Sequence, residues 1–375
     1  MRKHTNPGYS ALFLGLLVFF FSFGALIEVP KSTIRLVPDP GFGTGIDWGY
    51  YFPTGIDQLI GFLKDGSFYM ASSRRSKILL FSPTGELLSE FGRPGQGPGD
   101  LTYPSDVSIL DGRYIVVKES GMTRRISIFN LQGESFKIIQ ADNPLISCLA
   151  LGEGKIAVVT GQLNQNSRKD TVFLKDIHSG QTIPIASFDY KIPTRSRIQV
   201  PHMYPMVHLA RIDRDKLIVG FSEHANLSIY SIEGKRLEEF SLDLPMRKIK
   251  KSEMENYLMK QADAERDQNR KIRLKKTIRE SFGTMSFPEF YPAYHRIAVD
   301  AQDHILVFGH DAWLDGSPVA FRIYSKTGEF IGETQIEDGE YQPVYPQNFY
   351  KEWFYVYLNK KIDDGTILFA RVLIR

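Results

Sequence analysis

Short apolar runs recur along the chain, and a tight polar turn precedes each of them. In every copy an Asp/Gly-rich turn stands before alternating or continuous apolar residues, which is typical of a hairpin that enters a buried strand. Six copies occur: KDGSFYMA at Lys64, LDGRYIVV at Leu110, GEGKIAVV at Gly152, DRDKLIVG at Asp213, AQDHILVF at Ala301 and DDGTILFA at Asp363. The pattern predicts a chain built mainly from β-hairpins.

A second pattern follows each of the first five copies. It consists of a strand with period-two alternation, a turn that ends in glycine, and another strand. The five segments are KILLFSPTGELL at Lys77, RISIFNLQGESF at Arg125, TVFLKDIHSGQT at Thr171, NLSIYSIEGKRL at Asn226 and AFRIYSKTGEFI at Ala320. The turn glycines are 48, 47, 54 and 94 residues apart, and they are Gly85, Gly133, Gly180, Gly234 and Gly328.

This spacing predicts an all-β fold, a six-bladed β-propeller with four-stranded antiparallel blades, because such units repeat about every 40–50 residues. The interval of 94 residues contains a charged insert. The chain ends soon after the sixth copy, so we expect the β-prone run STIRLV at residues 32–37 to supply the missing outer strand and close the ring. The alternative is a β-sandwich, which gives no reason for two turn types to alternate at a nearly fixed spacing.

The first repeat runs from Asp65 to Ile109 and reads DGSFYMASSRRSKILLFSPTGELLSEFGRPGQGPGDLTYPSDVSI. It resembles the NHL-repeat family of β-propellers, in which an outer strand ends in Phe-Gly, a Gly/Pro-rich crossover follows, and a proline opens the next inner strand. The matching positions are Phe91, Gly92, Gly97, Pro98, Gly99 and Pro104. The later repeats keep only the turns and the strand alternation, as in divergent six-bladed propellers of the bacterial envelope. The resemblance implies a fold and a general binding role, and no particular reaction.

Glycine-rich loops can also bind phosphate, and the stretch from Phe91 to Val107 contains four glycines. A phosphate loop presents backbone amides at the start of a helix that follows a strand. Here the glycines lead into a loop and then a strand, while Pro94 and Pro98 remove two amides. We therefore interpret this stretch as a structural junction between blades, marked by Gly92, Gly95, Gly97, Gly99 and Pro104.

The N-terminus has the features of an export signal. Arg2, Lys3 and His4 precede an apolar run of 17 residues from Ala11 to Ile27, an order typical of a secretory signal. Residues 1–29 are predicted to be a signal peptide, cleaved before Ala25, or an uncleaved membrane anchor, because the run has the minimum length for a bilayer span. Residues 30–375 are predicted to form the propeller outside the cytoplasm, in the periplasm or the extracellular space.

Residues 247–281 interrupt the repeats between the fourth and fifth blades. The segment 247–280 contains 12 basic and 6 acidic residues, a net charge of +6, whereas the whole chain has +3. Ser252 and Glu255 have the spacing of a capping box at a helix start, and Met254, Tyr257 and Leu258 form a short apolar stripe. We expect one or two helices, which serve either as a solvated surface or as a contact for a partner protein or a membrane surface.

Composition supports a folded β protein without a nucleic-acid partner. Aromatic residues make up 13% of the chain, which favours strands, and the net charge is too small to imply nucleic-acid binding. Cys148 is the only cysteine, so neither an intrachain disulfide nor a Cys-based zinc site can form. Its apolar neighbours predict that Cys148 is buried as a small hydrophobe.

Two groups of residues are candidates for ligand binding. The first group lies in equivalent loops of the first two blades and comprises Arg74, Arg75, Arg124 and Arg125. These arginines are expected either to form a basic rim that captures acidic groups or to pair with neighbouring carboxylates. The second group, His202 and His208, precedes the fourth blade without the spacing of a helical zinc motif. A divalent metal in the central channel would need ligands from several blades, which spacing does not reveal.

The leading functional hypothesis is an exported, non-enzymatic propeller that binds a protein, peptide or glycan ligand, because such folds carry function on loops over a rigid frame. The alternative is a metal-assisted lyase or hydrolase that uses the central channel, although the sequence contains no Gly-x-Ser-x-Gly elbow. A third hypothesis is the ectodomain of a sensor. No cofactor and no nucleic-acid partner are predicted.

Overall fold

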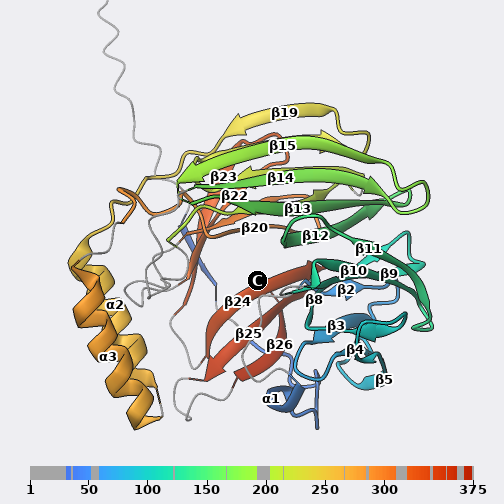
Figure 1. Ribbon diagram of the computed structural model, residues 1–375, viewed down its shortest axis with the longest axis horizontal. Coiled ribbons are helices and arrows are strands. Elements are labelled where there is room, and N and C mark those ends of the chain that lie inside the picture. Colours follow the sequence, from blue (N-terminus) through green and yellow to red (C-terminus); the bar gives the residue numbers. More distant parts are fainter. Residues whose placement is uncertain are drawn as a thin grey trace, which may run out of the picture.

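The fold is a β-propeller in which antiparallel sheets surround a central axis (Figure 1). The computed structural model describes residues 31–34, 37–51, 59–120, 123–165, 167–191, 203–213, 215–265, 267–283, 287–309, 319–337, 341–351, 353–360 and 367–373. The predicted signal or anchor at residues 1–29 lies outside these ranges. No helix within them combines the length and the apolar character that a bilayer span needs.

Five sheets in the described part of the chain each contain a blade of four antiparallel strands, and the sheet of blade five has one additional parallel strand at its edge. Blade one contains β2 (Gly61–Phe62), β3 (Phe68–Ser72), β4 (Lys77–Phe81) and β5 (Leu87–Phe91). Blade two contains β8 (Pro104–Leu110), β9 (Tyr114–Glu119), β10 (Arg125–Asn130) and β11 (Ser135–Gln140). Blade three contains β12 (Leu145–Gly152), β13 (Lys155–Leu163), β14 (Ser167–Asp176) and β15 (Thr182–Lys191). Blade four contains β16 (Val207–Ile212), β17 (Lys216–Phe221), β18 (Asn226–Ser231) and β19 (Arg236–Ser241). Blade five contains β20 (Arg296–Val299), β21 (Ile305–Phe308), β22 (Ala320–Tyr324) and β23 (Phe330–Ile336).

The turn glycines that the repeats identify have the predicted role. Gly85, Gly133, Gly180, Gly234 and Gly328 all have φ between 79° and 87°, a left-handed conformation that side chains disfavour. Several of them also approach the preceding blade closely. A Cβ atom on Gly133 would lie 2.6 Å from Phe91, and one on Gly328 would lie 2.4 Å from Phe240. Glycine at these turns therefore permits both the hairpin and the contact between blades.

A sixth sheet at the C-terminus has three strands: β24 (Tyr341–Tyr350), β25 (Trp353–Lys360) and β26 (Ile367–Leu373). The structure thus has five four-stranded blades and not the six that the repeats predict. The expected N-terminal strand forms as β1 (Lys31–Ile34), but it pairs in parallel with β23 of blade five and not with β26. In the described residues, the segment after β1 forms one bridge to β26, between Pro38 and Val372. Pro38 and Pro40 lack amide donors, so neither can donate a hydrogen bond to β26.

The N-terminal residues 38–51, called the closing segment below, nevertheless join the C-terminal sheet to blade one. The Asp39 amide donates to the Arg371 carbonyl at 3.0 Å, and the Arg371 guanidinium lies 2.6 Å from the Asp39 carboxylate. Burial opposes ionisation of Asp39, but the Gly41 amide and Arg371 outweigh it and lower the pKa of that carboxyl. Trp48, in the short helix α1 (Trp48–Tyr51), is buried against Phe369 and Phe81, each with a centroid distance of 5.1 Å.

Core clusters fill the spaces between neighbouring sheets. Phe91 of blade one packs on Phe129 of blade two at a centroid distance of 5.1 Å, and Phe188 of blade three stacks on Phe221 of blade four at 4.7 Å. Phe321 of blade five shares a cluster with residues of β25 and β26, and the closing segment belongs to the cluster between β25, β26 and blade one. Apolar contacts therefore run around the ring without a break.

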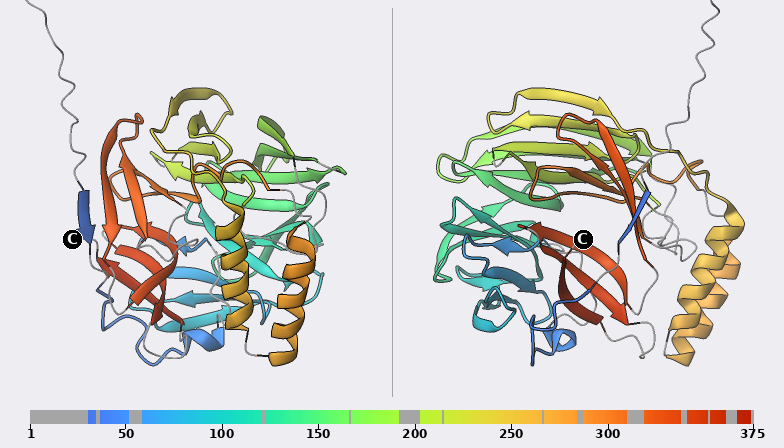
Figure 2. Two further views of the ribbon diagram at one scale, coloured as in Figure 1. Left: turned by 90° about the vertical axis from the view of Figure 1, so that its left-hand side faces the viewer. Right: turned by 180° about the vertical axis from the view of Figure 1, so that it is seen from behind.

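The charged insert forms two helices, α2 (Lys251–Ala264) and α3 (Gln268–Phe282), which project beside the blades (Figures 1 and 2). The predicted apolar stripe is confirmed, since Met254 and Leu258 are buried and pack with Met203 and Tyr291 of the propeller. The predicted capping box is wrong. α2 begins two residues earlier than that motif requires, with Lys250 and not Ser252 at the N-cap position and no side-chain hydrogen bond there.

We predict that Trp48→Ala lowers the free energy of unfolding by about 3–5 kcal/mol, because it empties an aromatic site between the C-terminal sheet and blade one. Urea denaturation followed by fluorescence measures this change. Tyr50→Ala in the same helix is the control, since Tyr50 is 62% exposed, and we expect a loss of about 1 kcal/mol or less. Equal losses in the two variants would show that the closing segment does not hold the ring together.

Candidate functional site

A central cavity of about 730 Å³ follows the axis of the ring. Its wall is formed mainly by the first strand of each blade, together with residues at the end of β24. The polar and charged side chains that line it are Asp106, Ser108, Lys118, Ser147, His208, Arg211, His295, Arg296, Asp300, Asp303, Tyr350 and Lys351. Apolar side chains between them include Ile109, Leu149 and Ile297. Carboxylates, imidazoles and cations from different blades therefore meet in one space.

His208, a predicted binding residue, lies on β16 and faces this cavity. His295 precedes β20 and lines the same end of the cavity, so two imidazoles come from neighbouring blades. The ring of Tyr294 packs beside His208 at a centroid distance of 5.3 Å. Tyr294 is fully buried, which raises the pKa of its hydroxyl. Its oxygen would lie 2.4 Å from a Cβ on Gly220, so glycine at that position makes room for the tyrosine that supports His208.

Asp106 and Lys118 form an ion pair at the wall of the cavity, with Nζ 2.7 Å from Oδ2. The side chains are 10% and 11% exposed, so the pair is shielded from water but still reaches the cavity. Lys118 also donates to the Ile146 carbonyl of blade three at 2.9 Å, and Asp106 accepts from the Leu59 amide beside blade one at 3.4 Å. The pair thus links three blades as well as contributing charge to the cavity.

The opposite end of the cavity carries Arg211, Asp300, Asp303 and Lys351. The Arg211 guanidinium donates to the Leu151 carbonyl at 3.1 Å, which orients it along the wall. Asp300 accepts from the His304 ring at 2.9 Å. Both ends of the cavity therefore present charged groups of both signs, which suits a polar ligand more than an apolar one.

The four arginines that the sequence singles out lie away from the cavity. Arg74 is exposed, and Arg124 donates to the Asp142 carbonyl at 2.8 Å. Arg75 pairs with Glu90 at 3.0 Å and lies over the rings of Tyr50 and Tyr51. Arg125 is buried. Arg75 and Arg125 thus pair with carboxylates, which is one of the two roles predicted for the four arginines. The other role, the capture of acidic ligands, stays a prediction.

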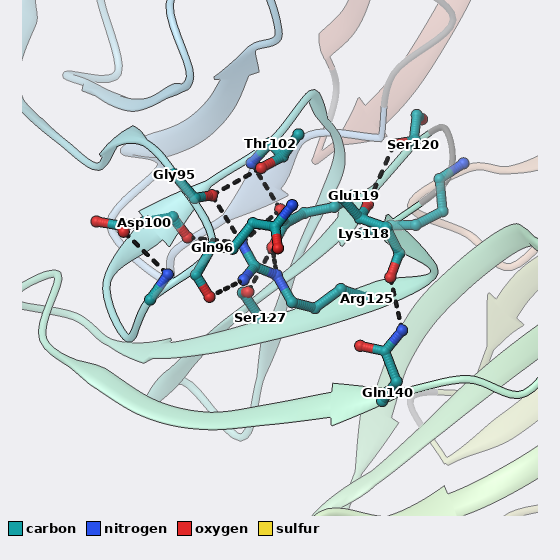
Figure 3. A network of polar contacts seen from close by, with 12 residues as sticks. Gly95, Gln96, Asp100, Thr102, Lys118, Glu119, Ser120, Arg125, Ser127 and Gln140 are labelled. Carbon is teal, nitrogen blue, oxygen red and sulfur yellow. Dashed lines mark hydrogen bonds and ion pairs between the residues drawn. The ribbon is translucent and has the colours of Figure 1, made fainter.

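Arg125 anchors the glycine-rich crossover between blades one and two (Figure 3). It binds the carboxylate of Glu119 through Nε and Nη2 at 2.7 and 2.8 Å. Its other donors reach the carbonyls of Gln96 at 2.7 Å and Asp100 at 2.9 Å. Glu119 is fully buried and also accepts from the Thr102 amide at 2.6 Å. A bidentate pair of this kind satisfies the charge of both partners away from water.

The crossover itself has the predicted structural role. It contains the short parallel pair β6 (Arg93–Pro94) and β7 (Asp100–Leu101) and leads from β5 to β8, with Pro104 as the first residue of β8. No helix follows the glycines in this described stretch, as a phosphate loop would require. The glycines with positive φ are Gly92, Gly95 and Gly99. Gly97 contributes its amide, which donates to the Asp100 carboxylate at 2.9 Å.

The structure bears on the predictions for Cys148 and for a metal site, but not on the prediction for His202. His202 lies outside the described residues. Cys148 is buried as predicted, and burial raises the pKa of its thiol to about 12. Among the described residues no group of three or more His, Cys, Asp or Glu is arranged to hold a metal ion. Asp106, Lys118 and His295 line the cavity but are not among the candidate residues predicted from the sequence. Asp106 had a usable signal, because it follows the proline that opens an inner strand.

Comparison with known proteins identifies the fold and no family. The sequence matches no protein-family profile and no curated protein. A candidate exported protein of Bacteroides fragilis NCTC 9343 aligns with 92% of this chain and 99% of its own, at 12% identity and a TM-score of 0.51. A DUF4221 family member from Bacteroides vulgatus aligns with 92% of this chain and 97% of its own, at 12% identity and a TM-score of 0.50. At this identity the likeness shows the propeller fold alone.

We predict that Arg125→Met lowers the free energy of unfolding by about 3–5 kcal/mol, because it leaves the buried Glu119 carboxylate without its partner. Chemical denaturation measures the loss. The double variant with Glu119→Gln removes the unpaired charge and should recover part of the stability. Arg124→Met is the matched control at the exposed neighbouring position and should cost about 1 kcal/mol or less. If the Arg125→Met variant is as stable as the Arg124→Met control, Arg125 does not anchor the crossover.

Proposed function

We propose that this protein is an exported binding module, a propeller of NHL-like type whose central cavity holds a peptide or glycan ligand. In this proposal the three-stranded C-terminal sheet counts as a sixth blade, with the closing segment lying where its outer strand would be. The predicted export signal supports a location outside the cytoplasm. The protein would act there as a rigid receptor for a polar ligand or for an exposed segment of a partner protein.

The cavity is the observation that carries the proposal. Its volume of about 730 Å³ lies in the range of roughly 300–1,000 Å³ that is usual for ligand sites. Its wall provides donors on Arg296, Arg211 and Lys118, acceptors on Asp106 and Asp300, and apolar surface between them. Hydroxyl-rich or amide-rich ligands require this mixture, because each buried polar group of the ligand needs a partner.

We predict that Ser147→Trp weakens ligand binding, because Ser147 lines the cavity on β12 and an indole there would fill part of it. The labelled protein is first applied to peptide and glycan arrays, and the ligands found are then titrated by calorimetry. Ser135→Trp is the matched control, since Ser135 is exposed on the outer strand β11. We expect at least a roughly tenfold weaker affinity for the cavity variant and an unchanged affinity for the control. Equal binding by both variants would place the ligand outside the cavity.

A metal-assisted lyase or hydrolase is the second candidate function. The observation in its favour is that the imidazoles of His208 and His295 and the Asp106 carboxylate line the same cavity, although in the described structure these three groups are not close enough together to hold a metal ion. Elemental analysis of the purified protein tests this alternative, with the His208→Ala/His295→Ala variant as the control. A bound divalent metal that is lost in the variant would favour catalysis, whereas equal metal content in both proteins would argue against these ligands.

A further inference from the structure

The helix α3 has many more positive charges than its packing uses. Its 15 residues include six basic side chains and one acidic side chain. Three of the basic residues serve the hairpin itself. Lys271 and Lys275 lie 3.2 and 2.6 Å from the Asp263 carboxylate of α2. Arg270 lies 3.1 Å from the carboxylate of Glu265, the C-cap residue of α2. These ion pairs hold the helices together. They leave the remaining cations on α3 for another role.

The three remaining cations share one exposed face of the helix. Arg273, Lys276 and Arg279 follow each other at intervals of three residues, which places them on neighbouring turns of the same side. All three are exposed. Lys276 lies 3.7 Å from Glu280, but both side chains are largely exposed, and such a surface pair contributes little. Ile272 stands among these cations with 64% of its surface exposed.

The exposed face is not needed to hold the hairpin on the propeller. That attachment is made by apolar residues on the other side of the helices, where Ile278 and Phe282 of α3 share a buried cluster with Met203 and Tyr291. Figure 2 shows α2 and α3 standing in front of the blades when the ring is seen from their side. A cationic face around an exposed isoleucine is thus directed away from the hairpin core.

We propose that this face of α3 docks on an anionic membrane surface. Cations near such a surface are attracted to the lipid headgroups, and an isoleucine among them can enter the interface between headgroups and acyl chains. The chain also favours a membrane over a soluble acidic partner. Its apolar run ends at Ile27 and β1 begins at Lys31, and this linker spans at most about 14 Å. A retained anchor would thus hold blade five, which follows the helical hairpin, close to the bilayer.

A single fluorescent label tests this docking. Cys148 is buried, so the variant Ile272→Cys offers one accessible thiol for an environment-sensitive fluorophore. The labelled protein is prepared in the form in which it is exported. It is mixed either with vesicles of pure phosphatidylcholine or with vesicles of phosphatidylcholine that contain about 30% phosphatidylglycerol. We expect a blue shift and quenching by lipid-borne quenchers only in the anionic vesicles, both reversed by 0.5 M salt through screening. The control label, at Leu88→Cys on blade one, is exposed in the structure and should not respond.

The charges are tested by a variant and a control with the same net charge. Arg273→Gln/Lys276→Gln/Arg279→Gln should weaken the partition of the protein into anionic vesicles by about fivefold per cation, on the order of 100-fold in total. Arg113→Gln/Lys169→Gln/Lys235→Gln removes three exposed cations from three blades and should weaken it far less. The proposal is overturned if the label at position 272 does not respond to anionic lipid, if the label at position 88 responds equally, or if both charge variants lose the same affinity.

Discussion

A propeller depends on the closure of its ring, because an open ring would expose the edge of a sheet and the apolar face between two blades. Here closure cannot come from the C-terminal sheet alone, which has three strands. The closing segment completes it with one bridge to Val372, the pair between Asp39 and Arg371, and the indole of Trp48 in the core beside blade one. Residues separated by more than 300 positions in the chain therefore become neighbours.

The polar residues of the ring have two tasks at once. Lys118 and Asp106 tie blade two to its neighbours and also face the cavity. Arg125 is bound so completely by Glu119 and the crossover carbonyls that it belongs to the frame. A buried charge is tolerated only where hydrogen-bonding or charged partners satisfy it. Here those partners lie where two blades meet, so these buried ion pairs are found at the junctions between blades. The cavity receives Asp106 and Lys118 from one such junction, so the contacts that join the blades also position these two groups of the proposed ligand site.

The two helices stand apart from this frame. Their attachment uses a few apolar residues, among them Met254 and Phe282, and their net charge differs in sign from that of the remaining chain, which is negative once the insert is subtracted. The insert therefore adds a surface of different chemistry to a propeller that is complete without it. Ligand binding in the cavity and docking through α3 would be separate properties of the molecule, one central and one peripheral, and they require no common residue.

Local features of the sequence were sufficient for the blades, the turn glycines, the helices of the insert and the junction at Gly92–Gly99, because each depends on residues close together in the chain. The number of complete blades and the partner of β1 were not predictable in this way, since both depend on contacts between residues from opposite ends of the chain. The candidate site shows the same division. His208 was found from the sequence, whereas its convergence with His295, Asp106 and Lys118 was not, because these side chains come from different blades. Only the closed ring decides which of them face the same cavity.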